Sequence, residues 1–598
     1  MDFVMKSYSL VFICICITLE KHCQGESESS AVIVSTKYGL LKGQTRYFPQ
    51  PVGNISVVNK FLGVPYAAPP IGELRFLPPQ KPKHWKGVYD ATRFKPVCYQ
   101  DPSYNQMFWK KDVNWSQSDD CLYLNVYAPN TTLSHERYPV MVYIHGGGYE
   151  TGSPVVSPGD ALPMWEVVLV TIQYRLGPFG FISTGDSAAP GNYGMLDQIE
   201  ALKWIQLTIE AFKGDPSRVT IFGESAGGSS VGLLLLSPLS AGLFHRAIAL
   251  SGSDFAPFAV NTRKEATDLG RATAKKFDCP KETSKDMITC MRNVPAWIIY
   301  NKTKGDVNSW RPVVDGIFLQ DSPTNLRKAN KFHPYPLMVG VTSDDGSFFF
   351  NENEVYKTDS LENFNKSCLG LFKSIRRFGW EDRIILDDHI EDAVLFQYTP
   401  WSDTKSKHTL RQGLIDLVTD FAFAAPAHAI LELHAKVAPA YHFVFSHQSK
   451  LRNNLPSWKG ATHKDDTPYE FGFPFMNLTV LQHYDEHDKN VSAIMISLFT
   501  NFARTGNPTP QPVAGCTWTP FNENNNPYLN ITAKPEMRNN FHIRNIAFWN
   551  KYYPKLLTTC KYPEISVSKS GGLSKFFMDP YTIVVIAIVL VCSLMVHF

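Results

Sequence analysis

The sequence predicts an α/β protein built on a large, mostly parallel twisted sheet with flanking helices. Short runs rich in β-branched and apolar residues alternate with segments whose apolar residues have helical spacing. One such run, residues 219–222, passes through Gly223-Glu-Ser-Ala-Gly227 into a helix-compatible segment at 231–236. This strand–turn–helix order is typical of a tight turn that exposes a serine at the C-terminal end of a parallel strand.

Composition indicates an ordinary globular protein. Of the 598 residues, 44% are hydrophobic and 19% are charged, with a formal net charge of +3. No basic tract or aromatic-plus-basic stripe suggests a nucleic-acid partner. The pattern predicts neither a metal site nor a cofactor, because no paired CxxC motif or clustered histidine is present.

Residues 10–19 form a short apolar run after Lys6, which predicts a secretory signal peptide over residues 1–25. Export is also indicated by sequons, in which Ser or Thr follows Asn at +2 without an intervening Pro. The predicted glycosylation sites are Asn54, Asn114, Asn130, Asn301, Asn365, Asn477, Asn490 and Asn530.

Ser225 at the centre of the tight turn is the predicted nucleophile, with a buried structural serine as the alternative. Upstream, the apolar run 140–144 breaks into His145-Gly146-Gly147-Gly148. Glycines permit positive φ, so successive N–H groups can converge on an oxyanion, whereas a flexible loop is the alternative. We expect Gly147, Gly148 and Ala226 to supply these N–H donors.

Four motifs carry a family resemblance: Pro65–Phe76 (PYAAPPIGELRF), Ser118–Asn125 (SDDCLYLN), His145–Gly148 and Phe222–Gly227 (FGESAG). Together they resemble the type-B carboxylesterase/cholinesterase family of α/β-hydrolases, with matching blocks from about residue 33 to about 556. The resemblance implies one catalytic domain, over residues 26–562, with an active site at the base of a gorge. It also implies a Ser-His-acid triad that hydrolyses esters through an acyl-enzyme.

The same resemblance places the remaining triad members after the serine. The acid position falls on Asp345, where the family commonly has Glu, and the neighbouring Asp344 is the competing assignment. His463 opens the pattern H-x-x-acid-x-P-Y-x-F-G, which resembles the catalytic histidine loop. A base within reach of Ser225 and an acid that orients the base are what this chemistry requires.

The resemblance gives a weaker indication of the substrate. The pocket residues it implies are Trp109 (with Trp115 as the alternative), Phe258, Trp310 and Phe348. Glu224, beside the nucleophile, is expected to add a negative potential that favours cationic groups, with a buried acid that holds the turn as the alternative. Aromatic rings could hold a choline cation, but the pattern is not diagnostic. The sequence therefore favours a general carboxylic ester hydrolase acting on a small-molecule ester, with a cholinesterase as the alternative.

Cys98 and Cys121 are candidates for a disulfide in a secreted chain, with metal binding as the less supported alternative. The resemblance implies a second disulfide between Cys279 and Cys290. The family's third disulfide is missing, because its positions fall on Ala425 and Ile546. Cys368, Cys516 and Cys560 have no assigned partner.

The C-terminal segments predict membrane attachment. Residues 563–580 are a small, polar stalk, and residues 581–598 form an apolar tail. This pattern fits a GPI signal with attachment at Ser570, Gly571 being close behind, and a transmembrane span is the alternative. We therefore expect an extracellular protein tethered to the cell surface, and the sequence leaves a homo-oligomer open.

A hypothesis from another class is a cholinesterase-like adhesion protein that works through its surface rather than by catalysis. Membrane tethering and glycosylation suit that role as well. The presence of Ser225, His463 and the triple glycine favours the enzyme, whereas Asp at position 345 is the one departure that favours adhesion.

Overall fold

The computed structural model describes residues 30–48, 53–102, 116–131, 137–306, 309–350, 358–376, 388–450, 458–476 and 484–559. The chain divides into two units, Met1–Pro554 and Lys555–Phe598. The first unit contains all strands of the described chain. The predicted attachment residue Ser570 and the apolar tail lie outside the described residues.

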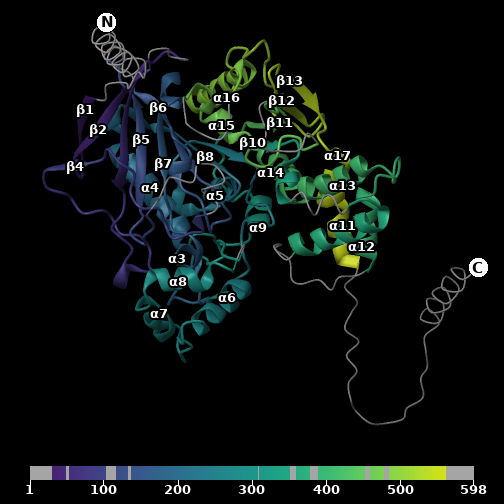
Figure 1. The fold of residues 1–598 in the computed structure, drawn as a ribbon, viewed down its shortest axis with the longest axis horizontal. Helices are drawn as coiled ribbons and strands as arrows, with labels where there is room; N and C mark the ends of the chain where they lie inside the picture. Colours follow the sequence, from purple (N-terminus) through teal and green to yellow (C-terminus); the bar gives the residue numbers. More distant parts are fainter. Residues whose placement is uncertain are drawn as a thin grey trace, which may run out of the picture. The chain divides into compact units, whose positions relative to one another are not determined.

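A 13-stranded mixed sheet organises the first unit (Figure 1). Its path is β1-β2-β3-β5-β7-β6-β8-β9-β10-β11-β12-β13, and β4 pairs with β2. The strands are β1 Ser30–Thr36, β2 Gly39–Tyr47, β3 Val57–Pro65, β4 Val88–Asp90, β5 Tyr123–Pro129, β6 Tyr138–Ile144, β7 Val168–Ile172, β8 Gly214–Glu224, β9 Arg246–Leu250, β10 Leu337–Thr342, β11 Ala440–Phe445, β12 Pro527–Ile531 and β13 Glu536–Asn539.

The middle of the sheet is parallel and both ends are antiparallel. Strands β7, β6, β8, β9, β10, β11 and β12 pair in parallel register, whereas β1, β2, β3, β5 and β13 pair antiparallel with their neighbours along the path. The central strands are apolar runs whose residues are all buried, as in β6, β7 and β10. Parallel strands covered on both faces need such runs, whereas β1 alternates exposed and half-buried residues at the sheet edge. The fold is the α/β-hydrolase architecture that the sequence predicts.

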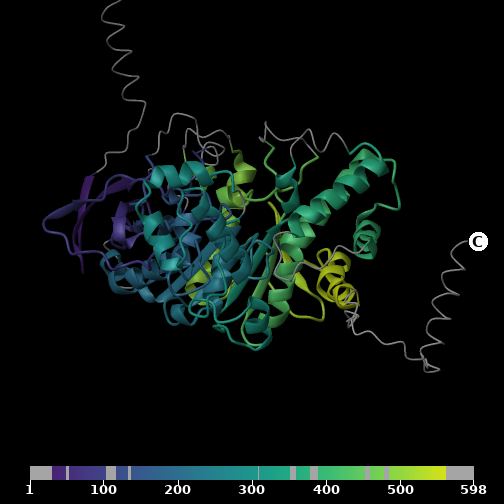
Figure 2. The ribbon, with the colours of Figure 1, turned by 90° about the horizontal axis from the view of Figure 1, so that it is seen from below.

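Helices cover both faces of the sheet (Figures 1 and 2). The helices of the described chain are α3 Gly177–Phe181, α4 Tyr193–Thr208, α5 Ala226–Leu236, α6 Arg263–Lys275, α7 Ser284–Arg292, α8 Ala296–Thr303, α9 Pro323–Lys328, α11 Leu361–Arg376, α12 Asp388–Tyr398, α13 Lys407–Thr419, α14 Ala425–His434, α15 Thr467–Glu470, α16 Glu486–Thr505, α17 Ile543–Ala547 and α18 Tyr553–Thr559.

Helices α13 and α14 form one continuous helical segment that a π turn, Asp420–Ala424, interrupts. This segment, Lys407–His434, is the one helix of the described chain that is long and apolar enough to cross a membrane. It is mostly buried within the protein, which is typical of a core helix. Two residues of the π turn have different neighbours: Asp420 contacts residues at the start of α17, and Phe423 packs near His463.

Candidate functional site

Ser225 lies at the junction that the sequence predicts, between β8 and α5. Its backbone has φ 60° and ψ −122°, a strained conformation that turns the chain sharply from strand to helix. The Ser225 N–H donates to the Leu250 carbonyl at 2.8 Å, which ties the turn to β9. The strain is therefore held by the neighbouring strand.

The positions on either side of Ser225 require glycine, because the backbone of β6 passes too close to leave room for a side chain. A Cβ at Gly227 would lie 2.0 Å from the Ile144 carbonyl oxygen, and one at Gly223 would lie 2.6 Å from the same atom. Helix α5 therefore starts directly against the end of β6. The tight packing explains the small residues on both sides of the serine.

The glycine loop after β6 lies beside the serine. A Cβ at Gly146 would meet the Ser225 Cβ at 3.0 Å. Gly147 and Gly148 have φ of 104° and 62°, and both line the same cavity as Ser225. Ala226 begins α5 immediately after Ser225. The three predicted donors are thus grouped around one point, although their function as donors stays a prediction.

Asp345, and not Asp344, faces the histidine. Asp345 is fully buried after β10 and accepts hydrogen bonds from the Ser251 hydroxyl at 2.8 Å and the Thr342 N–H at 2.9 Å. Its Oδ1 lies 2.7 Å from Nδ1 of His463. Asp344 instead accepts from the Gln412 amide at 2.9 Å. The shorter acid therefore reaches His463.

The other ring nitrogen of His463 contacts Glu224. Nε2 lies 3.0 Å from Oε1 of Glu224, an ion-pair contact without hydrogen-bond alignment. Among the described residues, no hydrogen bond joins the Ser225 hydroxyl to His463. A base takes the proton of a nucleophilic serine along such a bond. His463 thus contacts Asp345 and Glu224, and it lines the same cavity as Ser225; the catalytic roles of the three residues stay predictions.

Buried carboxylates surround His463. Glu224, Asp345, Asp466 and Glu470 are each at most 1% exposed, and together with His463 we call them the acidic centre. Both side-chain oxygens of Glu224, Asp466 and Glu470 have no hydrogen-bond partner. Sequence analysis identified Glu224 but missed Asp466 and Glu470. Their signal was present in the histidine motif, where His463 is followed by an acid at +3 and another at +7.

Burial and mutual repulsion set the ionisation of the acidic centre. Burial, followed by the charges of Glu224 and Asp345, raises the pKa of Asp466 to about 8. Burial likewise raises the pKa of Glu224 and, together with the charge of Asp466, raises that of Glu470. Burial lowers the pKa of His463, but Glu224 and Asp345 outweigh burial and the net shift is upward. The centre therefore retains protons at neutral pH.

A cavity of about 900 Å³ opens above the serine. Its lining includes Ser225, His463 and the predicted pocket residues Phe258, Trp310 and Phe348. Phe423 and Phe349, which sequence reasoning missed, also contribute, and the Phe423 ring centroid lies 4.9 Å from that of His463. Trp109 and Trp115 lie outside the described residues. The cavity is thus mainly aromatic and apolar.

The π turn places Phe423 in this cavity, whereas Asp420 contacts residues at the start of α17. Asp420 is buried, and its Oδ1 lies 2.7 Å from Nδ1 of His542. Its Oδ2 accepts from the Asn545 amide at 2.6 Å. Burial opposes ionisation of His542, but the hydrogen bond and charge of Asp420 raise the pKa of His542 to about 9. An ion pair therefore ties the π turn to α17.

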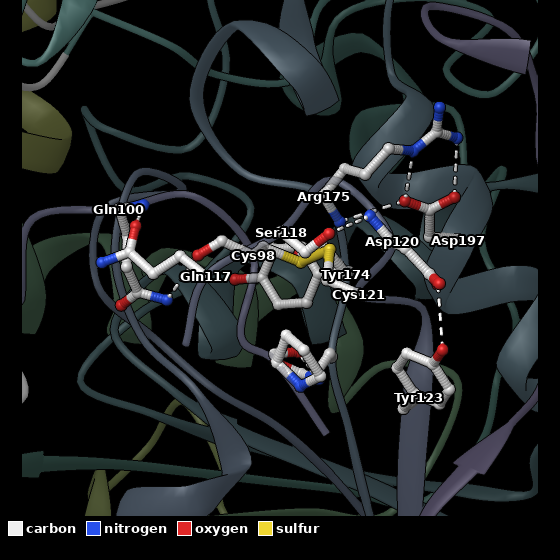
Figure 3. Close-up of a disulfide and its surroundings, with 12 residues drawn as sticks. Cys98, Gln100, Gln117, Ser118, Asp120, Cys121, Tyr123, Tyr174, Arg175 and Asp197 are labelled. Atoms are coloured by element: carbon white, nitrogen blue, oxygen red, sulfur yellow. Dashed lines mark hydrogen bonds and ion pairs between the residues drawn. A yellow bond between two sulfur atoms is a disulfide. The ribbon is translucent and has the colours of Figure 1, made fainter. Parts of the chain in front are cut away.

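The structure contains two disulfides, Cys98–Cys121 and Cys279–Cys290. The first lies beside the buried pair of Arg175 and Asp197, whose nitrogen and oxygen atoms approach to 2.7 Å (Figure 3). Cys368 and Cys516 carry free thiols, and Cys560 lies outside the described residues. Within the described chain, no group of three or more His, Cys, Asp or Glu residues could hold a metal ion.

The predicted glycosylation sites differ in exposure. Asn54, Asn130, Asn301 and Asn490 are exposed, and Asn365 is half-buried. Asn530 is 4% exposed on β12 and accepts a hydrogen bond from the Ser446 hydroxyl at 2.7 Å. A glycan at Asn530 does not fit this structure, because the side chain is enclosed between strand and loop. Asn114 and Asn477 lie outside the described residues.

The chain belongs to the carboxylesterase family, whose sequence profile matches residues 30–549. Two relatives define its place within that family more closely. The chain is 35% identical to human (Homo sapiens) Neuroligin-2 over 580 residues, which cover 88% of this chain and 68% of the relative. It is 34% identical to mouse (Mus musculus) Neuroligin-3 over 631 residues, covering 92% and 74% respectively.

These relatives correct the predicted activity. Neuroligins are cholinesterase-like adhesion proteins and not active esterases. The prediction of an enzyme that hydrolyses carboxylic esters is therefore wrong, and a small-molecule ester substrate is not supported. The hypothesis of a non-catalytic, cholinesterase-like adhesion protein fits the comparisons better. The relatives are cell-surface membrane proteins, which supports the predicted cell-surface location.

Proposed function

We propose that this chain is a cell-surface adhesion protein that binds a partner on a neighbouring cell through its folded surface. The observation that carries the proposal is its similarity to the neuroligins across about nine-tenths of the chain.

The test is an aggregation assay with the full chain displayed on cells. Cells that express the chain are mixed with differently labelled cells from a tissue of the same organism. We expect mixed aggregates that excess soluble ectodomain disperses. Ser225→Ala should aggregate to the same extent, because no step of adhesion requires the hydroxyl.

Two results would contradict the proposal. One is aggregation no greater than that of mock-transfected cells although surface staining shows the full chain. The other is turnover of acetylthiocholine or a neutral acyl ester that disappears in Ser225→Ala.

For membrane attachment, we propose a GPI anchor linked at Ser570, with the apolar segment 581–598 as its signal. Phosphatidylinositol-specific phospholipase C should then release the protein from intact cells. Retention after this treatment, with release by detergent alone, would favour a transmembrane span instead. Association between copies stays a prediction, and crosslinking of the full chain at the cell surface tests it.

A further inference from the structure

The positive charge of the molecule is concentrated near the N-terminal edge of the sheet. Residues 30–100 contain ten Lys or Arg side chains and two acidic ones, a net charge of +8. The rest of the chain is net negative, since the whole carries +3. The small overall charge therefore hides a strongly uneven distribution.

Three of these ten basic side chains are neutralised. Arg46 and Lys60 lie 3.4 and 3.7 Å from Oδ1 of Asp160, and Arg75 lies 2.8 Å from Asp119. The other seven form no ion pair with any described residue. We call these seven the basic face: Lys37, Lys42, Lys81, Lys83, Lys86, Arg93 and Lys95. Six of them are exposed, and Lys95 is half-buried.

Backbone contacts bring the first part of the basic face together. The Trp85 N–H donates to the Tyr38 carbonyl at 3.0 Å, and the Trp85 indole N–H donates to the Leu40 carbonyl at 2.9 Å. The segment that carries Lys83 and Lys86 therefore packs on the β1–β2 turn, which carries Lys37. Figure 1 shows β1, β2 and β4 together at one edge of the sheet.

The second part of the basic face continues along β2 and β4. Lys42 on β2 is paired in register with Asp90 on β4. Lys95 lies near β4, because its Nζ is 5.1 Å from the centroid of the Tyr89 ring. The Cγ of Lys95 and the carbonyl of Arg93 both lie beside Gly63 on β3. The seven cations thus occupy one corner of the fold rather than being dispersed over the surface.

Few acids face this corner. Asp90 is exposed, but it is engaged by the Thr92 hydroxyl at 2.7 Å. Glu200 on α4 is 8% exposed and Asp120 is half-buried. These three carboxylates face Lys81, Lys42, Lys95 and Tyr89 from neighbouring elements. The basic face therefore keeps an excess of positive charge.

Resting on the adhesion function proposed above, we propose that the basic face binds a linear sulfated glycan of the opposing cell surface or matrix. Six of the seven cations are lysines, which act as flexible point charges rather than as planar forks for one bidentate anion. Such a set suits many anionic groups along an extended chain. The outer surface of a cell offers sulfated glycans as such polyanions, whereas the anionic lipids lie mainly in the cytoplasmic leaflet.

The test measures binding of fluorescein-labelled heparin to cells that display the full chain. The variant Lys37→Gln/Lys83→Gln/Lys86→Gln removes three exposed cations of the basic face. We expect affinity at physiological salt to fall at least about tenfold. The slope of log affinity against log salt should fall by about 2 to 3, because three fewer counterion-releasing contacts form.

The matched control is Lys275→Gln/Lys281→Gln/Lys285→Gln, which removes three exposed lysines from α6, α7 and their connection. It should bind heparin within about twofold of the unaltered chain, since its net charge changes equally but at a different site. Desulfated heparin should bind weakly to all three proteins. Equal losses in both variants, no heparin binding by the unaltered chain, or equal binding of poly-glutamate would overturn the proposal.

Failure of this inference is distinguishable from failure of the adhesion function. If the basic-face variant and heparinase-treated cells still aggregate normally and heparin binding is unchanged, the glycan site is wrong but adhesion stands. If heparin binding is lost selectively in the basic-face variant while neither the unaltered chain nor any variant aggregates cells, the glycan site stands and adhesion is wrong.

Discussion

Two buried clusters of charged side chains differ in their balance of charge: one pairs a cation with an anion, and the other has an excess of carboxylates. In the first, Arg327 donates to both oxygens of Asp254 at 2.9 and 2.8 Å and lies 3.0 Å from Nδ1 of His434. Burial and the charge of Arg327 lower the pKa of His434 to about 3, so the ring is neutral. The acidic centre instead gathers four buried carboxylates around His463, and Lys464 is the other cation whose charge acts on Glu224 and Glu470.

Comparing the two clusters shows how each compensates for the removal of its charges from water. In the Arg327 cluster, one cation balances one anion and the geometry is bidentate, so desolvation is largely compensated. In the acidic centre, carboxylate oxygens lack partners, and protons must supply the missing neutralisation. The first cluster should therefore be sensitive to substitution at any pH, and the second to pH itself.

The largest effect is expected in the balanced cluster. Asp254→Asn leaves the Arg327 guanidinium fully buried without its counter-charge, which should lower the free energy of unfolding by about 3–5 kcal/mol. Urea denaturation at pH 7 measures it. The control is Asp268→Asn, which breaks an exposed pair with Lys264 and should cost at most about 1 kcal/mol. Similar losses in both variants would contradict the comparison.

The next effect concerns pH and the acidic centre. The pKa of Asp466 is raised to about 8 in the folded state, above its ordinary value of 3.8. Between these values the folded state binds the extra proton, so the free energy of unfolding falls as pH rises from about 4 to 8. Asp466→Asn removes this dependence. Relative to the variant, the unaltered protein should lose about 1–3 kcal/mol between pH 5 and pH 7.5.

Urea denaturation of the unaltered protein and of Asp466→Asn at the two pH values gives the free energies of unfolding that test this prediction. Asp278→Asn, at an exposed position, serves as the control and should follow the unaltered protein. Parallel pH profiles for the unaltered protein and Asp466→Asn would show that Asp466 does not hold a proton in the folded state.

The smallest expected effect is a change in the pKa of His463. Glu224 and Asp345 raise the pKa of His463, and Glu224 contributes through the 3.0 Å contact with Nε2. Glu224→Gln should therefore lower the pKa of His463. Histidine-selective NMR titration measures this shift, with His463→Gln to assign the signal. An unchanged pKa would indicate that Nε2 faces a group other than Glu224.

Sequence reasoning predicted the fold correctly and selected Ser225, Asp345 and His463, because both predictions depend on local patterns. The turn at Ser225 needs glycines within a few residues, and the central strands need continuous apolar runs, so each leaves a compact signal in the chain. The choice of Asp345 over Asp344 also followed from position in a motif. These features required no knowledge of distant contacts.

Other features depend on packing across the fold. The contact between Glu224 and His463 joins residues more than two hundred positions apart, and only tertiary structure shows it. The basic face was hidden because the sequence was judged on its total charge. The predicted activity was wrong for a different reason: a complete set of triad residues establishes a resemblance to a family, whereas relatives with the same fold are adhesion proteins.

The π turn connects two distant parts of the first unit mechanically. Asp420 is bound to His542 and Asn545 at the start of α17, while Phe423, three positions later, packs on His463 in the cavity. Load applied to α17 therefore reaches the wall of the cavity through a single turn of helix. The π turn thus connects α17 directly to the residues that pack on His463.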